Sequence, residues 1–261
     1  NVGPHIDNYD VFLLQGLGHR RWHIGSEPIE DEEIVEGADV RVLADFEPDD
    51  EYVLGPGDML YLPPRVAHHG VAIDDCMTYS IGFRAPSQRD LVADFLQYAL
   101  EHVDPDTRYS DPDLAPADHP GELTDDAVER VRALLREPVA DDAMIDRWFG
   151  QYVTEPQRNR IAVPPEEPVS ADDLADALRR GTDLRRSPAT RIAYRSHEDG
   201  TATLFVNGDA RDLSGDGADL APVLAGHERI PAADLQPHLD GDALSLLTEL
   251  VNGGFLELDA G

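Results

Sequence analysis

The sequence predicts a mixed fold, mainly β with added α, in three parts. Residues 1–86 are predicted to form a β sandwich or barrel, 87–155 a helical region, and 156–261 a linker and a winged-helix-like module. Three observations support this division. Short apolar runs alternate with Gly/Pro turns in the first part, helical spacing begins near residue 87, and a proline-rich segment begins at residue 156.

The first part contains several short apolar runs that are typical of strands. Turn residues such as Gly55-Pro56-Gly57-Asp58 separate them, and an acidic, polar loop covers residues 26–37. Many short strands with such turns indicate a sandwich or barrel. The predicted strands are residues 9–15, 20–24, 40–43, 52–54, 59–62, 70–73 and 77–83.

The second part changes to a helical period. Ser87 and Asp90 resemble a capping box at the start of a helix, and a second helix begins at Thr124. The Pro- and Asp-rich residues 104–122 between them predict an extended connection. A third helix carries an apolar stripe that would form either core or a subunit interface: Met144, Ile145, Trp148, Phe149 and Tyr152.

The third part begins with a linker marked by four prolines within residues 156–168. Helices and small β-wings within about a hundred residues suggest a winged-helix-like module. The predicted helices are residues 170–180, 219–225 and 243–252, and the predicted strands are residues 191–195, 202–207 and 255–258.

The charge of the chain is strongly acidic, with a formal net charge of −32, and all 21 basic residues are arginine. The acidity would either attract a basic partner or reflect a proteome adapted to high salt. Its spread along the whole chain favours high salt, and it argues against direct nucleic-acid binding. A local cluster of arginines could still support DNA binding by the third part: Arg179, Arg180, Arg185, Arg186, Arg191 and Arg195.

The single cysteine, Cys76, excludes an intramolecular disulfide and is expected to be a packing residue in a strand. A cytoplasmic location follows as the default. No apolar run approaches the roughly 18–20 residues that a membrane span requires. The sequence starts as if within a domain, so we expect residues upstream of it in the natural protein.

Three residues have the spacing of a metal site. His5 and Asp7 lie two apart in an extended segment, so their side chains point to the same side. His68 follows an apolar strand that ends in Pro63-Pro64, and in a double-stranded β-helix it would lie opposite His5 and Asp7. Two histidines and one carboxylate on one face of a metal suit iron(II) with open positions. His69 is the alternative ligand, and the spacing from Pro64 favours His68.

Arg20 lies one strand after the His-x-Asp triplet. If it faces the barrel interior, its guanidinium could bind a dicarboxylate through two parallel hydrogen bonds. The alternative is a surface arginine, which we expect Arg21 to be.

These motifs resemble the JmjC/cupin ribosomal oxygenases. The resemblance rests on HIDNYDVFLLQGLGHRRW (residues 5–22), GDMLYLPPRVAH (57–68), YSIGFRAP (79–86), YSDPD (109–113), WFG (148–150) and LVNGG (250–254). It covers the whole chain and implies a JmjC double-stranded β-helix, a helical dimerisation region and a C-terminal winged helix. It also implies that part of the family's JmjC domain lies upstream of His5.

The resemblance also implies an activity and its cofactors. His5, Asp7 and His68 would bind Fe(II), and Arg20 would bind the distal carboxylate of 2-oxoglutarate, with O2 as the other co-substrate. The nearest branch of the family hydroxylates an arginine of protein sixteen of the large ribosomal subunit, so a ribosomal protein substrate and a homodimer are expected. Ser80 has no predicted direction and no assigned role.

Two other functions remain open. A related JmjC enzyme could act on histidine or asparagine of another protein, or as a demethylase, because the barrel motifs do not include the substrate pocket. A non-catalytic metal-binding cupin could instead use its winged helix to bind DNA.

Overall fold

The computed structural model describes residues 2–38, 40–113, 119, 121–139, 141–156 and 159–259. Contacts divide the chain into two units, residues 1–92 and 93–261. Each unit has its own hydrophobic core. None of the described helices is long and apolar enough to cross a membrane. The boundary that we predict between the helical region and the winged-helix-like module lies inside the second unit and stays a prediction.

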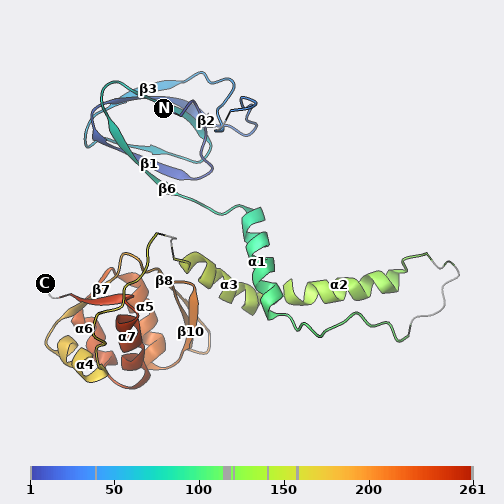
Figure 1. Cartoon of the computed structure of the whole chain (residues 1–261), viewed down its shortest axis with the longest axis vertical. Helices are drawn as coiled ribbons and strands as arrows, with labels where there is room; N and C mark the ends of the chain where they lie inside the picture. Colours follow the sequence, from blue (N-terminus) through green and yellow to red (C-terminus); the bar gives the residue numbers. More distant parts are fainter. Residues whose placement is uncertain are drawn as a thin grey trace. The chain divides into compact units, whose positions relative to one another are not determined.

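The first unit consists of two three-stranded antiparallel sheets that face each other (Figure 1). This is the sandwich or barrel architecture that the short apolar runs predict. One sheet has the order β4-β1-β6, formed by Met59–Leu62, Asp10–Leu17 and Met77–Phe83. The other has the order β3-β2-β5, formed by Asp50–Leu54, Arg20–Pro28 and Val66–Ala72.

The core of this unit lies between the two sheets. Strand β1 alternates, so that Val11 and Leu13 are buried, and β2 buries Trp22 and Ile24 in the same way. The opposite surface of the β4-β1-β6 sheet is unusually apolar for an exposed sheet. Its exposed large side chains are Met59, Tyr61, Met77, Tyr79, Ile81 and Phe83.

Two strand predictions in this unit are wrong. Residues 40–43 form no strand, and the segment makes only an isolated bridge between Ile34 and Leu43, because its acidic surroundings provide no partner strand. The strand predicted at residues 70–73 begins earlier, at Val66, so His68 lies inside β5 rather than after a strand. Cys76 is half-buried and lies just before β6, not within a strand.

Helix α1 (Gln88–His102) spans the boundary between the two units, and α2 (Asp125–Val139) and α3 (Asp142–Thr154) belong to the second. The capping box is present, because the Asp90 N–H donates to Ser87 Oγ and the Ser87 N–H donates to Asp90 Oδ2, both at 3.1 Å. The connection predicted over residues 104–122 lies partly outside the described residues.

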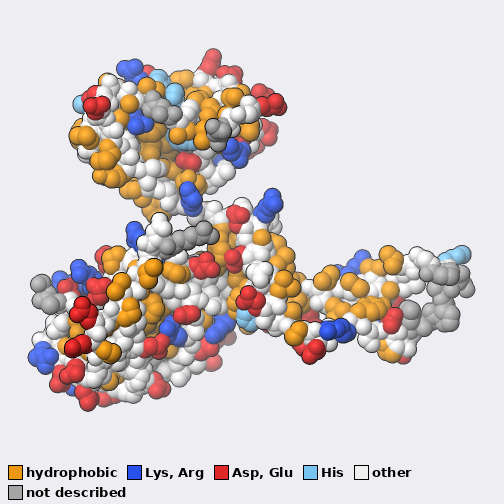
Figure 2. Space-filling view, viewed as in Figure 1, with side chains coloured by type: hydrophobic (Ala, Val, Ile, Leu, Met, Phe, Trp, Pro, Cys, Tyr) orange, Lys and Arg blue, Asp and Glu red, His pale blue; other side chains and the backbone are white. Residues whose placement is uncertain are grey.

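The apolar stripe of α3 divides between core and surface. Trp148 is buried, and its indole N–H donates to Asp94 of α1 at 2.7 Å, while its ring contacts Phe95 edge-on at 5.2 Å. Phe149, by contrast, is 49% exposed. Helix α2 has no buried residue at all among those described, and Figure 2 shows apolar side chains along its visible face.

The rest of the unit mixes short helices with small sheets. Three helices, α4 (Ala171–Arg179), α5 (Asp216–Gly226) and α7 (Gly241–Asn252), share one aliphatic core. The sheet β10-β9-β8 consists of Asp209–Leu213, Ala202–Val206 and Ile192–Ser196, and the sheet β11-β7-β12 of Arg229–Ile230, Asp183–Arg186 and Leu256–Asp259. Strands β7 and β11 and the short helix α6 (Ala232–Leu235) were not predicted, because each is too short for a periodic signal. Strand β10 was not predicted because three of its five residues are charged.

Candidate metal centre

The three predicted ligands lie together in the first unit. His5 forms an isolated antiparallel bridge with His68 of β5, in which each backbone N–H donates to the other residue's carbonyl, at 3.0 and 2.9 Å. The two imidazole centroids are 4.2 Å apart. Asp7 follows on the same side, and its Oδ2 lies 3.8 Å from His68 Nε2. One ligand atom from each residue lies within 4.8 Å of the others.

Hydrogen bonds to the backbone orient both imidazoles. Nδ1 of His5 lies 2.9 Å from the carbonyl of Gly3, and Nδ1 of His68 lies 3.0 Å from the carbonyl of Val66. A carbonyl can only accept, so in a neutral ring Nδ1 carries the proton and Nε2 has the free lone pair that a metal needs. Metal-bound histidines are generally held in this way.

The environment of His68 favours its neutral form. Burial lowers the pKa of His68, although the hydrogen bond to the Val66 carbonyl opposes this effect. Since a metal binds the neutral imidazole, burial removes a competing proton. Two imidazoles and one carboxylate on one side of a cavity are a donor set that fits iron(II).

The ligands open into a cavity of about 210 Å³. Arg20 lines it too, as the sequence analysis predicts for an interior residue. Its guanidinium lies 5.7 Å from the centre of the Trp22 ring, and Nη2 lies 3.5 Å from Cys76 Sγ. The remaining lining residues are Leu13, Thr78 and Ser80.

The Nε of Arg20 is buried and has no hydrogen-bond partner among the described residues. A buried N–H without a partner is costly. The guanidinium to which it belongs lies on a side chain that lines the cavity, so a carboxylate there would pair with Arg20.

The residues next in sequence point away from the site. Arg21 is exposed, and its Nε lies 3.0 Å from Glu51. The ring of His69 lies 6.1 Å from that of His23, its partner across β2 and β5, and His69 is not in the three-residue cluster. This geometry favours His68 over His69 as the ligand.

Thr78 and Ser80 are lining residues to which the sequence analysis assigned no function. They lie two residues apart in β6 and so point to the same face of the strand. This spacing could have identified them, but both faces of β6 carry apolar or small residues, so the sequence shows no contrast between the faces. The Thr78 hydroxyl donates to the Oε1 of Gln15 at 2.7 Å. The Nε2 of the buried Gln15 donates to two carbonyls, so its amide is fixed in one orientation.

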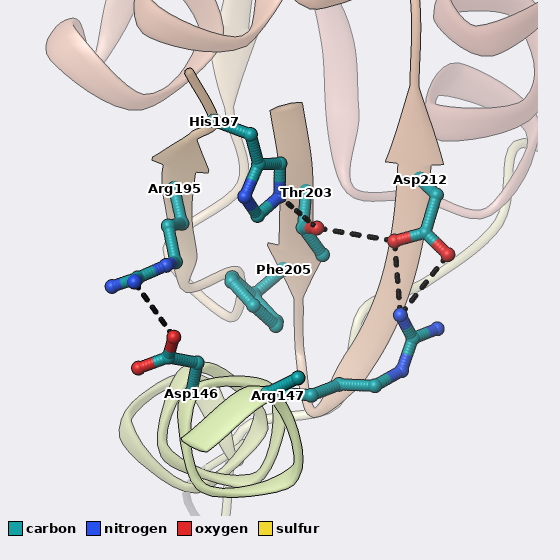
Figure 3. A pocket seen from close by; sticks show the side chains of 8 residues that line it. Asp146, Arg147, Arg195, His197, Thr203, Phe205 and Asp212 are labelled. Atoms are coloured by element: carbon teal, nitrogen blue, oxygen red, sulfur yellow. Dashed lines mark hydrogen bonds and ion pairs between the residues drawn. The ribbon is translucent and has the colours of Figure 1, made fainter. Parts of the chain in front are cut away.

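A second cavity, of about 310 Å³, lies between α3 and the β10-β9-β8 sheet (Figure 3). Its two arginines are each paired with an aspartate: Arg147 with Asp212 at 2.9 Å, and Arg195 with Asp146 at 2.6 Å. His197 lies within hydrogen-bonding distance of Thr203, which in turn donates to Asp212. No metal-ligand cluster is found here among the described residues.

Within the described residues, three of the six arginines in the cluster of the third part form ion pairs with acidic side chains. Arg179 pairs with Asp176 at 3.1 Å and Arg185 with Glu257 at 4.0 Å, while Arg195 forms the pair described above. Arg186 donates to the carbonyl of Ala225. Such pairing weakens the electrostatic case for DNA binding by this part.

Two family models match the chain. A JmjC domain matches residues 1–91, and a ROXA-like winged helix matches residues 135–257. The two matches agree with the sandwich that carries the metal-ligand cluster and with the helix-and-wing module.

Curated relatives and solved structures are similar over most of the chain. The Ribosomal protein uL16 3-hydroxylase of Escherichia coli is 34% identical over 255 residues, which are 97% of this chain and 66% of that protein. The Probable ribosomal oxygenase of Haemophilus influenzae is 37% identical over 81% of this chain and 54% of its own length. The chain therefore spans less than two thirds of either relative.

The crystal structure of E. coli YcfD superposes with a TM-score of 0.82 at 32% identity, over 99% of this chain and 68% of YcfD. A structure of YcfD in complex with cobalt and 2-oxoglutarate superposes with a TM-score of 0.80 at 32% identity, over 99% and 67%.

Proposed function

Since this chain belongs to the JmjC-domain ribosomal oxygenases, we propose that it is an Fe(II)- and 2-oxoglutarate-dependent oxygenase. Its proposed substrate is a ribosomal protein in the cytoplasm, and specifically an arginine side chain of uL16, protein sixteen of the large subunit. The observation that carries this proposal is one cavity that is lined by both a His-Asp-His cluster and an arginine, Arg20.

The residues of the cavity have distinct roles in this proposal. His5, Asp7 and His68 would hold the iron through two imidazoles and one carboxylate. Arg20 binds the distal carboxylate of 2-oxoglutarate, and its planar fork fits that group better than an ammonium would. Leu13 and Trp22 contribute apolar walls that exclude water.

The iron, when bound, supplies oxygen activation, in which 2-oxoglutarate and O2 yield succinate and CO2 while one oxygen atom enters a C–H bond of the substrate. The protein contributes positioning and a dry cavity, and no separate general base is required.

The test is mass spectrometry of ribosomal proteins, uL16 among them, after incubation with the chain, iron(II), ascorbate and 2-oxoglutarate. The expected result is a gain of one oxygen atom on an arginine. A gain on histidine or asparagine of another protein would instead favour the related JmjC activity. Turnover of 2-oxoglutarate that is absent under all conditions would contradict an oxygenase and leave a metal-binding cupin.

Two single variants test the ligand assignment. His68→Ala should abolish succinate formation without unfolding the chain, because only the metal site loses a donor. His69→Ala is the matched control, since this ring lies on the other face of β5. An inactive His69→Ala with an active His68→Ala would reverse the assignment.

We also infer a homodimer through the helical region. Helix α2 exposes Val131, Leu135 and Val139, while α1 exposes Leu96 and Leu100. Apolar side chains in this number on neighbouring helices are typical of an interface. The acidity of the chain calls for high salt in any test, because unscreened charge would separate the copies.

A further inference from the structure

Arg65, in the turn between β4 and β5, has a backbone conformation that is rare for an arginine. Its φ is 67°, and Asn207 is the other non-glycine residue with positive φ among those described. Asparagine tolerates the left-handed region, whereas a long side chain with a Cβ does not favour it. The surrounding structure must therefore hold Arg65 in place.

Hydrogen bonds from Arg65 connect three separate segments. Its backbone N–H donates to the carbonyl of Asp7 at 2.7 Å, and its own carbonyl accepts the Ile29 N–H at 3.0 Å. Its guanidinium donates to the carbonyls of Ile29 and Glu30, both at 2.6 Å, and to Asn8 Oδ1 at 3.0 Å. Arg65, which directly precedes β5, thus binds both the segment that contains Asp7 and the acidic loop.

The position of Arg65 also interrupts the register beside Asp7. Because His5 and His68 exchange both backbone hydrogen bonds, a regular antiparallel ladder would place Val66 opposite Asp7. Instead, the Arg65 N–H reaches the Asp7 carbonyl, and the Val66 N–H lies 3.4 Å from the carbonyl of Pro63. The irregularity lies directly at Asp7, the carboxylate of the candidate metal site.

We propose that Arg65 is a positioning residue that fixes Asp7 relative to His5 and His68 and thereby sets the geometry of the metal centre. It is not a ligand and does not line the cavity. Its guanidinium holds Asn8, the neighbour of Asp7, against the Ile29–Glu30 backbone, while its left-handed backbone brings its own N–H to Asp7. This inference rests on the proposed function.

Arg65→Gly separates the two contributions, because glycine adopts the left-handed conformation readily but has no guanidinium. The measurement is titration of Co(II) into the chain in the presence of 2-oxoglutarate, followed by visible absorption. The expected loss is about 10- to 100-fold in Co(II) affinity, as for other outer-shell partners of metal ligands. Addition of methylguanidinium should restore part of the affinity, which a general loss of stability would not allow.

Two further variants keep the test decisive if Arg65→Gly unfolds. Asn8→Ala removes a single bond of the network and should cause a smaller loss of affinity, while Arg65→Lys, which lacks the fork, should behave like the glycine variant. Arg21→Gly is the control, because Arg21 is exposed on the other face of β2. Folded Arg65 variants with wild-type Co(II) affinity and an unchanged absorption spectrum would overturn the proposal.

The two proposals fail differently. A wild-type chain that binds Co(II) but never forms succinate from 2-oxoglutarate would contradict the oxygenase alone. A chain in which wild type and Arg65→Gly bind Co(II) equally well would contradict the role of Arg65 alone.

Discussion

Replacing Arg20 by methionine should weaken the binding of 2-oxoglutarate while leaving iron binding nearly unchanged. Methionine keeps a long apolar side chain against Trp22 but removes the guanidinium. The lost group includes the buried Nε–H that has no partner among the described residues. A bound co-substrate carboxylate would then remain in the cavity without its cation.

The expected loss of affinity for 2-oxoglutarate follows from the desolvation of the charge pair between Arg20 and the co-substrate carboxylate. Removing one partner of a buried, hydrogen-bonded charge pair costs about 2–5 kcal/mol, and each 1.4 kcal/mol is about tenfold in affinity. Because Arg20 is only half-buried, we expect the lower part of this range. The Michaelis constant for 2-oxoglutarate should therefore rise by roughly 30- to 100-fold.

The assay is titration of 2-oxoglutarate into iron-loaded variants, with succinate formation as the readout. Arg21→Met is the matched control, since Arg21 points to the other face of β2 and pairs with Glu51. An unchanged Michaelis constant in Arg20→Met would remove this residue as the co-substrate anchor. A parallel loss of iron affinity would show that the substitution disturbs the site as a whole.

Three further predictions concern the second unit and its assembly. Gly150→Ala should lower the free energy of unfolding by about 1–3 kcal/mol in denaturant titrations, because the added Cβ would overlap the ring of Phe205. Gly226→Ala is the control, because its Cβ would meet open space. Equal stabilities of the two variants would contradict this packing. Leu135→Glu should convert the proposed dimer to a monomer in sedimentation at high salt, and a wild-type monomer at micromolar concentration would rule out the interface. A backbone hydrogen bond lowers the pKa of Asp183 below its ordinary 3.8, so its carboxylate stabilises the fold above that pH and loses this effect as the pH falls further. The difference in melting temperature between wild type and Asp183→Asn should therefore shrink between pH 5 and pH 2.5, and a constant difference would contradict the assignment.

Local patterns were sufficient to predict the architecture but not every element. The capping pair Ser87 and Asp90 gave the start of α1 correctly, because a cap is a local hydrogen-bond pattern. The strand predicted at residues 40–43 failed because β structure depends on a partner strand that local sequence does not specify. Strand β4, Met59–Leu62, was predicted from its apolar run alone, because both faces of its sheet are apolar and its sequence shows no alternation.

Some residues of the candidate metal site could be predicted from the sequence, and others could not. His5, Asp7 and His68 have distinctive chemistry and spacing, and the structure brings them together. The direction of the Ser80 side chain could not be predicted without the register of β6 on β1, which pairs Ser80 with Leu13. The contacts of Arg65 could not be predicted, because three of its partners belong to segments more than thirty residues away in sequence.

The adjacent imidazoles of β5 have a consequence for how correctly folded protein is recognised. A slip of β5 by one residue would turn every side chain to the opposite face and bring His69 to the inward position of His68. The slipped strand would still offer an imidazole to a metal, so metal content alone would not distinguish it from the native pairing. The slip would also carry Arg65 out of reach of Ile29 and Asn8, whose hydrogen bonds exist only in the native register. Protection of the Arg65 amide from hydrogen exchange would therefore report on native pairing where a metal assay would not.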